Sequence, residues 1–415
     1  MKSNVGTAVI AGLAYVAVAA PAAAQSAPQS MDTAQSVPEA VQGEVKASVP
    51  KEARAAASEW QLKPRWRVQY DVANIDGPND LAGTGNLQDI RRARVGVDLA
   101  MPKGFAARLE TELTTDPIEL TDAYVQWSDK RFKIILGQQK AQLPLDEENS
   151  NLNISFLERA AFVSAFGYTR RTGISGHYTK ADWALSGGVY TDPLILLNDV
   201  ATNSTSVDFR TYWSPQLAGT KLHLAASYHW RDLNDVGLAA TRYRSRPALR
   251  ITDTRYIGTP TLAVEKEQRF GLEAAAVRGR FHIVAETHWL KAQRDSLNDP
   301  TFFGAYAEVG IFLTKDSRPL KGGYFGAIKP RKSVGSGGLG AVQLNLRYDY
   351  LDLNSGAVTG GKQNGYLASL IWTPAENFRL MGQYTKLKYT DAAIAIAGDR
   401  KYSVDVLGMR GQISF

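Results

Sequence analysis

The sequence predicts a transmembrane antiparallel β-barrel, and three features of the chain support this prediction. From about residue 64 onward, short runs alternate between apolar and polar residues, which is the period of a strand with one buried face. Aromatic residues end many of the apolar faces, as expected where a barrel meets the two membrane interfaces. The connections tend to alternate between short turns and long loops, which is the arrangement of outer-membrane barrels.

The composition agrees with this class and excludes others. The chain has 415 residues, of which 44% are hydrophobic, with no cysteine and a net charge of +7. The lack of cysteine excludes a disulfide scaffold, a thiolate zinc site, an iron–sulfur cluster and a cysteine nucleophile. The mean hydropathy of −0.24 argues against a bundle of membrane-spanning helices. It is compatible with a barrel, because only alternate residues of each strand face lipid.

The N-terminus has the pattern of a secretory signal peptide. Lys2 supplies a positive charge, residues 5–20 are nearly all apolar or small, and the alanines at 22–24 provide a cleavage site. We therefore expect residues 1–24 to be removed after export. Residues 25–63 are rich in Ala, Ser, Gln, Pro and Glu, so we expect a disordered or loosely helical periplasmic leader, which acts as a plain linker or spans the periplasmic gap.

Residues 64–415 are expected to form the barrel domain. The alternation is clear in the runs 65–75, 91–99, 222–230 and 342–350. In the first run, Trp66 and Val68 lie on the face opposite Arg67. A soluble sandwich would also alternate, but the aromatic ends of the apolar faces and the pattern of connections favour a barrel in a membrane.

Residues 64–415 are long enough for 16 strands of roughly 9–11 residues with mixed connections. The connection at 314–338 is long where the alternation predicts a short periplasmic turn, which indicates either mis-paired strands or a functional insertion. The last run, 402–415, has alternating apolar residues and ends in Phe415. This ending resembles the sorting signal of bacterial outer-membrane barrels.

Basic side chains on the polar faces of the first strands are candidates for an anion path. Arg92 and Arg94 share one such face, and Arg67 and Arg108 occupy the corresponding faces of neighbouring runs. A row of cations lowers the barrier for anions, and a guanidinium group binds phosphate oxygens in pairs while staying charged. The alternative is that these residues only hydrate the lumen and pair with the acids of the same strands.

The long loop 231–266 carries a second group of basic residues. Arg242, Arg244 and Arg246 alternate, so an extended chain would point all three in the same direction. If the loop folds inward, these residues form a row of positive charges in the vestibule of the pore. If it folds outward, they bind the phosphates of lipopolysaccharide instead. We favour the inward arrangement.

The order of several short motifs resembles that of the phosphate-selective porin family, the O/P type of Gram-negative outer membranes. The similar stretches are Ile90–Val97, Asp122–Val125, Leu136–Lys140, Phe156–Arg159, Ile311–Pro319, Gly326–Arg331, Arg347–Leu353 and Gly360–Asn364. The resemblance implies a homotrimer of 16-stranded barrels, each narrowed by inward-folded loops and lined by arginines and lysines that pass anions. It also implies a long inward-folded periplasmic turn, which would account for residues 314–338.

The candidate substrate-binding residues are those expected to line the pore. The resemblance places Lys140 and Arg159 near the constriction and adds Arg91, Asp122 and Lys329. With the basic residues identified above, the full set is Arg91, Arg92, Arg94, Asp122, Lys140, Arg159, Arg242, Arg244, Arg246 and Lys329. The acids at 146–148 are unfavourable for an anion path, so we expect them outside the narrowest part. The presence of these acids leaves open whether the channel is strictly selective for phosphate.

Other motifs carry little weight. The stretch 356–362 resembles a phosphate-binding loop, but Gln363 stands where Ser or Thr must hold Mg²⁺. His223 and His229 share a strand face but lie six residues apart, which is too far for two ligands of one metal ion.

The expected function is a passive outer-membrane channel that favours anions, above all phosphate or polyphosphate. Two alternatives stay open, namely a porin for other small organic anions or sugars and a non-conducting barrel that ties the envelope together. We expect no enzymatic activity, cofactor, metal or nucleic-acid partner. Outer-membrane lipid and lipopolysaccharide are expected partners.

Overall fold

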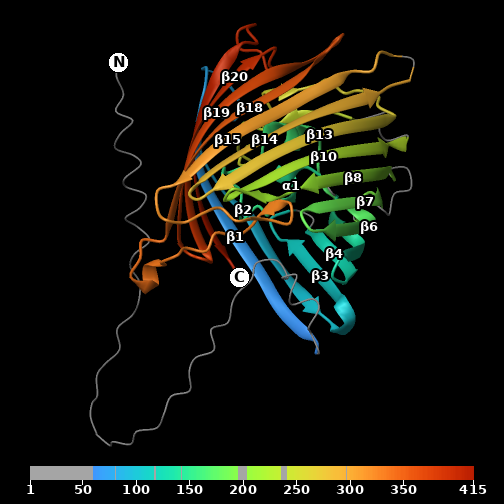
Figure 1. Cartoon of the computed structure of the whole chain (residues 1–415). Coiled ribbons are helices and arrows are strands. Elements are labelled where there is room, and N and C mark those ends of the chain that lie inside the picture. The colour runs from blue at the N-terminus through green and yellow to red at the C-terminus, as the bar shows by residue number, and fades with distance from the viewer. Residues whose placement is uncertain are drawn as a thin grey trace, which may run out of the picture. The chain divides into compact units, whose positions relative to one another are not determined.

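The computed structural model describes residues 59–79, 81–115, 118–141, 143–194, 203–234, 241–295 and 297–415. The expected signal peptide and most of the expected leader lie outside the described residues. Within the described ranges, sixteen long antiparallel strands form one closed barrel, as the sequence predicts (Figure 1). Each long strand pairs with its neighbours along the chain, and β21 pairs with β1 to close the wall. None of the described helices is long and apolar enough to cross a membrane.

The first half of the wall contains the shorter strands apart from its first two members. It consists of β1 (Gln61–Asp76), β2 (Gly85–Ala100), β3 (Phe105–Glu112), β4 (Glu119–Ser128), β5 (Phe132–Lys140), β6 (Arg170–Lys180), β7 (Trp183–Thr191) and β8 (Thr205–Trp213). The second half consists of β10 (Thr220–Asp232), β13 (Lys266–Arg278), β14 (Phe281–Gln293), β15 (Thr301–Phe312), β18 (Ala341–Ser355), β19 (Val358–Ala375), β20 (Phe378–Thr390) and β21 (Tyr402–Ser414). The barrel thus begins at Gln61, slightly ahead of the expected start at residue 64.

Short elements occupy the connections. They are the 3-10 helices η2 (Pro102–Gly104) and η5 (Val334–Ser336), the helices α1 (Leu145–Glu148) and α2 (Ala161–Ala165), and the two-residue strands β9 (Gln216–Leu217), β11 (Arg244–Ser245), β12 (Ile257–Gly258), β16 (Leu320–Lys321) and β17 (Tyr324–Phe325). Of these, β9 extends the wall beside β10, whereas β11 pairs with β12 and β16 pairs with β17.

The two faces of the wall differ as the alternation predicts. In β1, Trp66 and Tyr70 are 38% and 44% exposed, whereas Arg67 and Asp71 are 6% and 1% exposed. Apolar side chains therefore cover the outside, where lipid replaces water as the solvent, and polar side chains point into the barrel.

The connections separate the two rims of the barrel. At the rim that holds both barrel termini, Trp66 stacks on Phe415 with ring centroids 4.8 Å apart. Most turns at this rim are short, as at 101–104, 129–131 and 279–280, which identifies it as the periplasmic rim. The exception is the long periplasmic turn, residues 313–340.

Three segments fold into the barrel. The third loop, residues 141–169, buries Phe156 and Phe162 completely. The fifth loop, residues 233–265, crosses the mouth so that Tyr256 packs against Tyr389 of β20 at 5.6 Å. The inward arrangement favoured for this loop is therefore the observed one.

The long periplasmic turn enters from the opposite end. The main-chain nitrogen of Phe325 donates to Asn149 Oδ1 of the third loop at 2.8 Å. The length of this turn therefore reflects an insertion into the lumen and not mis-paired strands.

Candidate functional site

A β-bulge places two adjacent arginines of β2 inside the barrel. Gln69 of β1 lies opposite Arg92 and Tyr70 lies opposite Ile90, so Arg91 is an extra residue in the pairing. Arg91 and Arg92 are both buried. Simple alternation would send one of two neighbours to the lipid, and the bulge removes this restriction. The sequence pattern predicts Arg92 and Arg94 in the lumen, whereas Arg91 could be included only from the family resemblance.

Arg91 joins the wall to the third loop. Its guanidinium donates to both carboxylate oxygens of Glu158, at 2.5 and 2.9 Å. Arg410 of β21 donates to Glu158 at 3.1 Å and forms a two-bond pair with Asp71 at 2.6 and 2.7 Å. Burial alone would raise the pKa of Glu158, but the positive charges of Arg91, Arg92 and Arg410 hold it well below its ordinary value. Glu158 is therefore ionised and serves as a fixed bridge across the lumen.

Arg92 and Arg94 differ in their partners although they share a face. Arg94 is paired with Glu112 at 2.8 Å and with Glu110 at 3.2 Å. Arg92 donates to Gln69 Oε1 at 3.0 Å, and its buried Nε has no hydrogen-bond partner among the described residues. Arg92 also forms no ion pair with a carboxylate of the described residues. Arg92 is therefore the less compensated of the two cations.

Lys140 and Arg159 meet at the third loop, where both donate to the main-chain oxygen of Asn149. The Lys140 ammonium donates to the main-chain oxygen of Asn149 at 3.2 Å and also to that of Glu147. Arg159 donates to the main-chain oxygens of Asp146 and Asn149 at 2.7 and 2.9 Å. Both cations therefore bind carbonyl oxygens and hold the start of the loop.

The acids at 146–148 lie in the third loop, inside the barrel. Asp146 and Glu147 are buried inside the barrel. Glu147 lies 3.1 Å from Arg159, and Asp146 lies 3.5 Å from Arg347 of β18. Burial raises the pKa of Glu148. Because Asp146 and Glu147 have cationic partners, they can remain inside without leaving an unpaired negative charge in the lumen.

Asp122 and Lys329 have local partners. Asp122 of β4 accepts a hydrogen bond from Arg170 Nε at 2.6 Å. Lys329, in the long periplasmic turn, lies 2.8 Å from Glu376 in the short turn between β19 and β20. The structure brings Asp122 to the lumen but ties Lys329 to a neighbouring turn.

The basic residues of the fifth loop alternate in exposure. Arg242 and Arg244 are exposed, whereas Tyr243 and Ser245 between them are buried. Arg246 donates to Asp253 Oδ1 at 2.5 Å. Arg242 and Arg244 therefore share the exposed side of this segment, as the spacing predicts, whereas Arg246 is half-buried and paired.

Other arginines of this loop crowd the same region. Burial lowers the pKa of Arg250, and the positive charges of Arg91 and Arg246 lower it further. Burial and the neighbouring Arg246 and Arg244 lower the pKa of Arg255 to about 10. Arg250 thus lies within the electrostatic field of Arg91 on the wall, so the two groups of cations adjoin.

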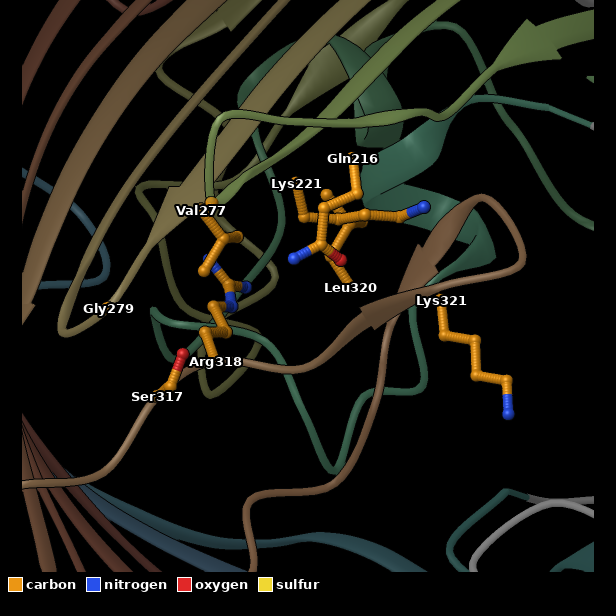
Figure 2. A pocket seen from close by; sticks show the side chains of 9 residues that line it. Gln216, Lys221, Val277, Gly279, Ser317, Arg318, Leu320 and Lys321 are labelled. Atoms are coloured by element: carbon orange, nitrogen blue, oxygen red, sulfur yellow. The ribbon is translucent and has the colours of Figure 1, made fainter. Parts of the chain in front are cut away.

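A pocket of about 410 Å³ opens beside the long periplasmic turn. It is lined by Lys221 of β10, Arg318 and Lys321 of the turn, and residues of β9 and β13 (Figure 2). Arg318 is already paired with Glu308 at 2.8 Å. No carboxylate is among the residues that line this pocket.

Several buried ion pairs were not identified from the sequence as part of the site. Arg210 of β8 forms two hydrogen bonds with Glu273 of β13, at 2.8 and 2.6 Å, and Arg347 lies 2.7 Å from Glu308 of β15. The alternation could place each residue on a lumen face. It could not pair them, because the partners lie on different strands.

The chain has relatives among known proteins. Residues 62–415 match the family model described as phosphate-selective porin O and P. An uncharacterized protein of Caulobacter vibrioides is 42% identical over 364 residues, which cover 85% of this chain and 74% of the relative. Porin O of Pseudomonas aeruginosa is 24% identical over 386 residues, covering 82% of this chain and 86% of the relative. The solved anion-selective porin from Comamonas acidovorans has a TM-score of 0.55 at 13% identity, over 86% of this chain and 100% of that chain, and so shares the fold.

Proposed function

The chain belongs to the phosphate-selective porin O and P family, and from this premise we propose that it is a passive outer-membrane channel that favours anions, with phosphate or polyphosphate as the principal solute. The pore-lining arginines and lysines act as transient ligands. Conduction requires several weak sites in series, because one deep site would hold the anion and block the current.

One observation carries this proposal. Between residues 241 and 256, the fifth loop contains five arginines and a single acid, Asp253. The loop crosses the mouth of the barrel, and its Arg250 lies within the field of Arg91 on the wall. A region with an excess of positive charge at the entrance raises the local concentration of anions.

The path we propose runs from this loop to the bulge of β2. An anion first meets Arg242, Arg244 and Arg246, where water still surrounds the side chains. It then passes Arg92, whose guanidinium lacks a carboxylate partner among the described residues. Arg94, Lys140 and Arg159 contribute field more than direct binding, since carboxylates or carbonyl oxygens already occupy their donors.

We also retain the expected assembly and processing as proposals. The family resemblance supports a homotrimer, and the composition of residues 1–24 supports a cleaved signal peptide. Contact with lipopolysaccharide at the long-loop rim is proposed on the same basis.

A porin for sugars or other organic anions is less well supported. Such a channel would use aromatic side chains along the path, and the candidates are Tyr124, Tyr190, Tyr212 and Tyr306. Tyr190 and Tyr306 are almost completely buried, and Tyr306 donates to Glu286 at 2.6 Å. Only Tyr124 and Tyr212 of this set are half-buried, so the four do not form a continuous open aromatic surface.

The test is the conductance of the purified protein in a planar bilayer under a KCl gradient, with phosphate then titrated in. We expect a reversal potential of anion-selective sign and a chloride current that low phosphate blocks. Arg92→Ala should weaken the block at every salt concentration, and Arg244→Ala should weaken it at low salt, where its field reaches the solute. Weak selectivity with no effect of phosphate would refute the phosphate proposal, and a complete lack of conductance would leave only the non-conducting structural barrel.

A further inference from the structure

The long periplasmic turn has two parts with different surroundings. Its first part, with β16 and β17, enters the barrel, whereas residues 326–340 extend beyond the ends of β15 and β18 at the periplasmic rim (Figure 1). Trp372 Nε1 donates to the main-chain oxygen of Leu339 at 2.7 Å. Trp372 shares the lipid-facing side of β19 with Leu370, which is exposed. This hydrogen bond therefore places the end of the turn at the outer surface of the barrel.

Residues 326–340 have a defined fold. The buried carboxylate of Asp316 accepts hydrogen bonds from Thr314 Oγ1 at 2.5 Å and from the main-chain nitrogen of Arg331 at 2.7 Å. Gly340 has a φ of +78°, and a Cβ there would lie 2.5 Å from a main-chain oxygen of β19. A small buried apolar cluster lies at the base of the turn and comprises Phe312, Ile328 and Ala341. The surface carried by this segment is therefore fixed in shape.

This surface is basic. Lys315, Arg331 and Lys332 are all exposed. Arg331 Nη1 donates to the main-chain oxygen of Lys315 at 3.2 Å, which brings the two residues together. Asp316, the nearest acid in the sequence, is turned inward to the donors described above. Within the described ranges, no carboxylate pairs with any of the three cations.

The same surface is also apolar at its outer edge. Leu313, Val334 and Leu339 are 55%, 48% and 66% exposed, respectively. Leu313 continues the lipid-facing side of β15, and Leu339 lies against Trp372. Exposed aliphatic side chains beside a tryptophan and basic residues are typical of the membrane–water interface.

We propose that the outer part of this turn binds an anionic phospholipid of the periplasmic leaflet. Lys315, Arg331 and Lys332 bind the phosphate of the headgroup, and an acyl chain lies along Leu313 and Leu339. These apolar residues continue the lipid-facing band of the barrel wall. A lipid molecule that surrounds the barrel can therefore reach this surface directly. The proposal goes beyond the channel function and does not depend on which anion the pore conducts.

The experiment uses tryptophan fluorescence of the full-length protein in phosphatidylcholine vesicles that contain phosphatidylglycerol. Bromine is placed on the acyl chains of one lipid or the other, and the difference between the natural protein and Trp372→Phe isolates the signal of Trp372. We expect brominated phosphatidylglycerol to quench Trp372 more strongly than brominated phosphatidylcholine. Replacing Arg331 and Lys332 by Gln should reduce this preference by about fivefold for each cation removed. Equal quenching by the two lipids, or an unchanged preference in the double variant, would overturn the proposal.

Lys321→Gln is the matched control. Lys321 is an exposed lysine of the same turn but lies on β16 beside the pocket, so its loss should leave the lipid preference unchanged. Native mass spectrometry of the unsubstituted protein and the Arg331→Gln/Lys332→Gln variant counts bound phosphatidylglycerol without altering Trp372. An unchanged single-channel conductance verifies that the double variant is folded.

The same experiment also tests two other occupants of this surface, a free anion and a second copy of the chain. Inorganic phosphate, added at an ionic strength matched with chloride, should not displace the lipid. Displacement by phosphate alone would identify a site for free anions and contradict the proposal. A preference that appears in dissociated subunits and is absent from the assembled protein would show that a second copy covers this surface, which would also contradict it.

Discussion

The arginines of the barrel wall and those of the fifth loop have opposite surroundings. On the wall, Arg410 is completely buried and donates to Asp71 and Glu158 together. On the fifth loop, Arg244 is exposed and forms no ion pair with a carboxylate of the described chain. A buried, paired arginine contributes to the position of the third loop and adds little net charge. An exposed, unpaired arginine adds little to stability but contributes its full charge to the field at the entrance.

Arginine therefore has two roles in this barrel, positioning of the third loop and attraction of anions to the entrance. Residue type alone does not distinguish them. Removing one member of a buried pair leaves its partner charged in a region of low dielectric constant, and this is strongly destabilising. Removing an exposed charge leaves no such partner. Variants of the two groups should therefore affect stability and selectivity in opposite proportions.

The largest expected effect is that of Arg410→Met on stability. The substitution leaves Asp71 without its two-bond partner and leaves Glu158 with Arg91 as its hydrogen-bonding arginine. We expect a loss of about 3–5 kcal/mol in the free energy of unfolding, as for other broken buried pairs. Urea unfolding of the reconstituted barrel, followed by tryptophan fluorescence, measures it. Arg244→Met is the control, with an expected change within about 0.5 kcal/mol, and equal losses in the two variants would contradict the distinction.

A smaller effect is expected from Glu158→Gln, which retains the shape of the side chain but removes its charge. We expect a loss of about 1.5–3 kcal/mol at neutral pH, the range for hydrogen bonds to charged groups. Because the pKa of Glu158 is lowered in the folded protein, the stabilisation is complete above the unfolded pKa of about 4.3. It is lost as pH falls through the lower, folded value.

The measurement for Glu158 compares unfolding of the natural protein and Glu158→Gln across a range of pH. The difference between them should be constant from pH 8 to about 5 and should decrease in more acidic solution. A difference that already declines between pH 7 and 6 would show that Glu158 is not held ionised by its arginines. The same substitution frees Arg91, so phosphate should block the chloride current at a lower concentration than in the natural protein.

Much of the fold was predictable from the sequence, because lipid and lumen impose the same alternation on every strand. The faces of Trp66 and Arg67 follow directly from it. The bulge that turns Arg91 inward was not predictable, since it depends on how β1 and β2 are paired. The pairing of Asp146 with Arg347 was also not predictable, because the two residues lie about 200 positions apart and are brought together only by the folded barrel.

For the candidate site, residue type and spacing identified the basic side chains. They did not show which of these cations are paired with carboxylates. The sequence treats Arg92 and Arg94 alike, and both were predicted in the lumen. The structure gives Arg94 two carboxylate partners and gives Arg92 an amide oxygen. Whether a cation is available to a solute depends on such contacts between strands, which no local pattern encodes.

Arg92 therefore has an intermediate place in the comparison, because it is buried like Arg410 but, like Arg244, forms no ion pair with a carboxylate of the described chain. We expect Arg92→Ala to weaken the phosphate block by about tenfold or more, which corresponds to the loss of a hydrogen bond to a charged group. Arg94→Ala is the matched control on the same face. It should affect stability more than the block, since it leaves Glu110 and Glu112 with one partner fewer. An equal effect of the two variants on the block would show that compensation does not decide which arginine binds.

The smallest effect is expected from Arg244→Gln on ion selectivity, and its dependence on salt sharpens the comparison. The side chain is exposed, so mobile ions screen its field over a distance of about 10 Å at 0.1 M salt and about 3 Å at 1 M. We expect the reversal potential to shift toward zero by a few millivolts at low salt and to be unchanged at 1 M, because only solutes in contact with the residue then sense it. The shift caused by Arg92→Ala should persist at 1 M, since buried charges are screened much less. Measurements of both variants at matched KCl ratios distinguish a long-range role for the fifth loop from direct binding at the wall. A shift for Arg244→Gln that survives at 1 M would place this arginine among the direct ligands and remove the distinction between the two groups.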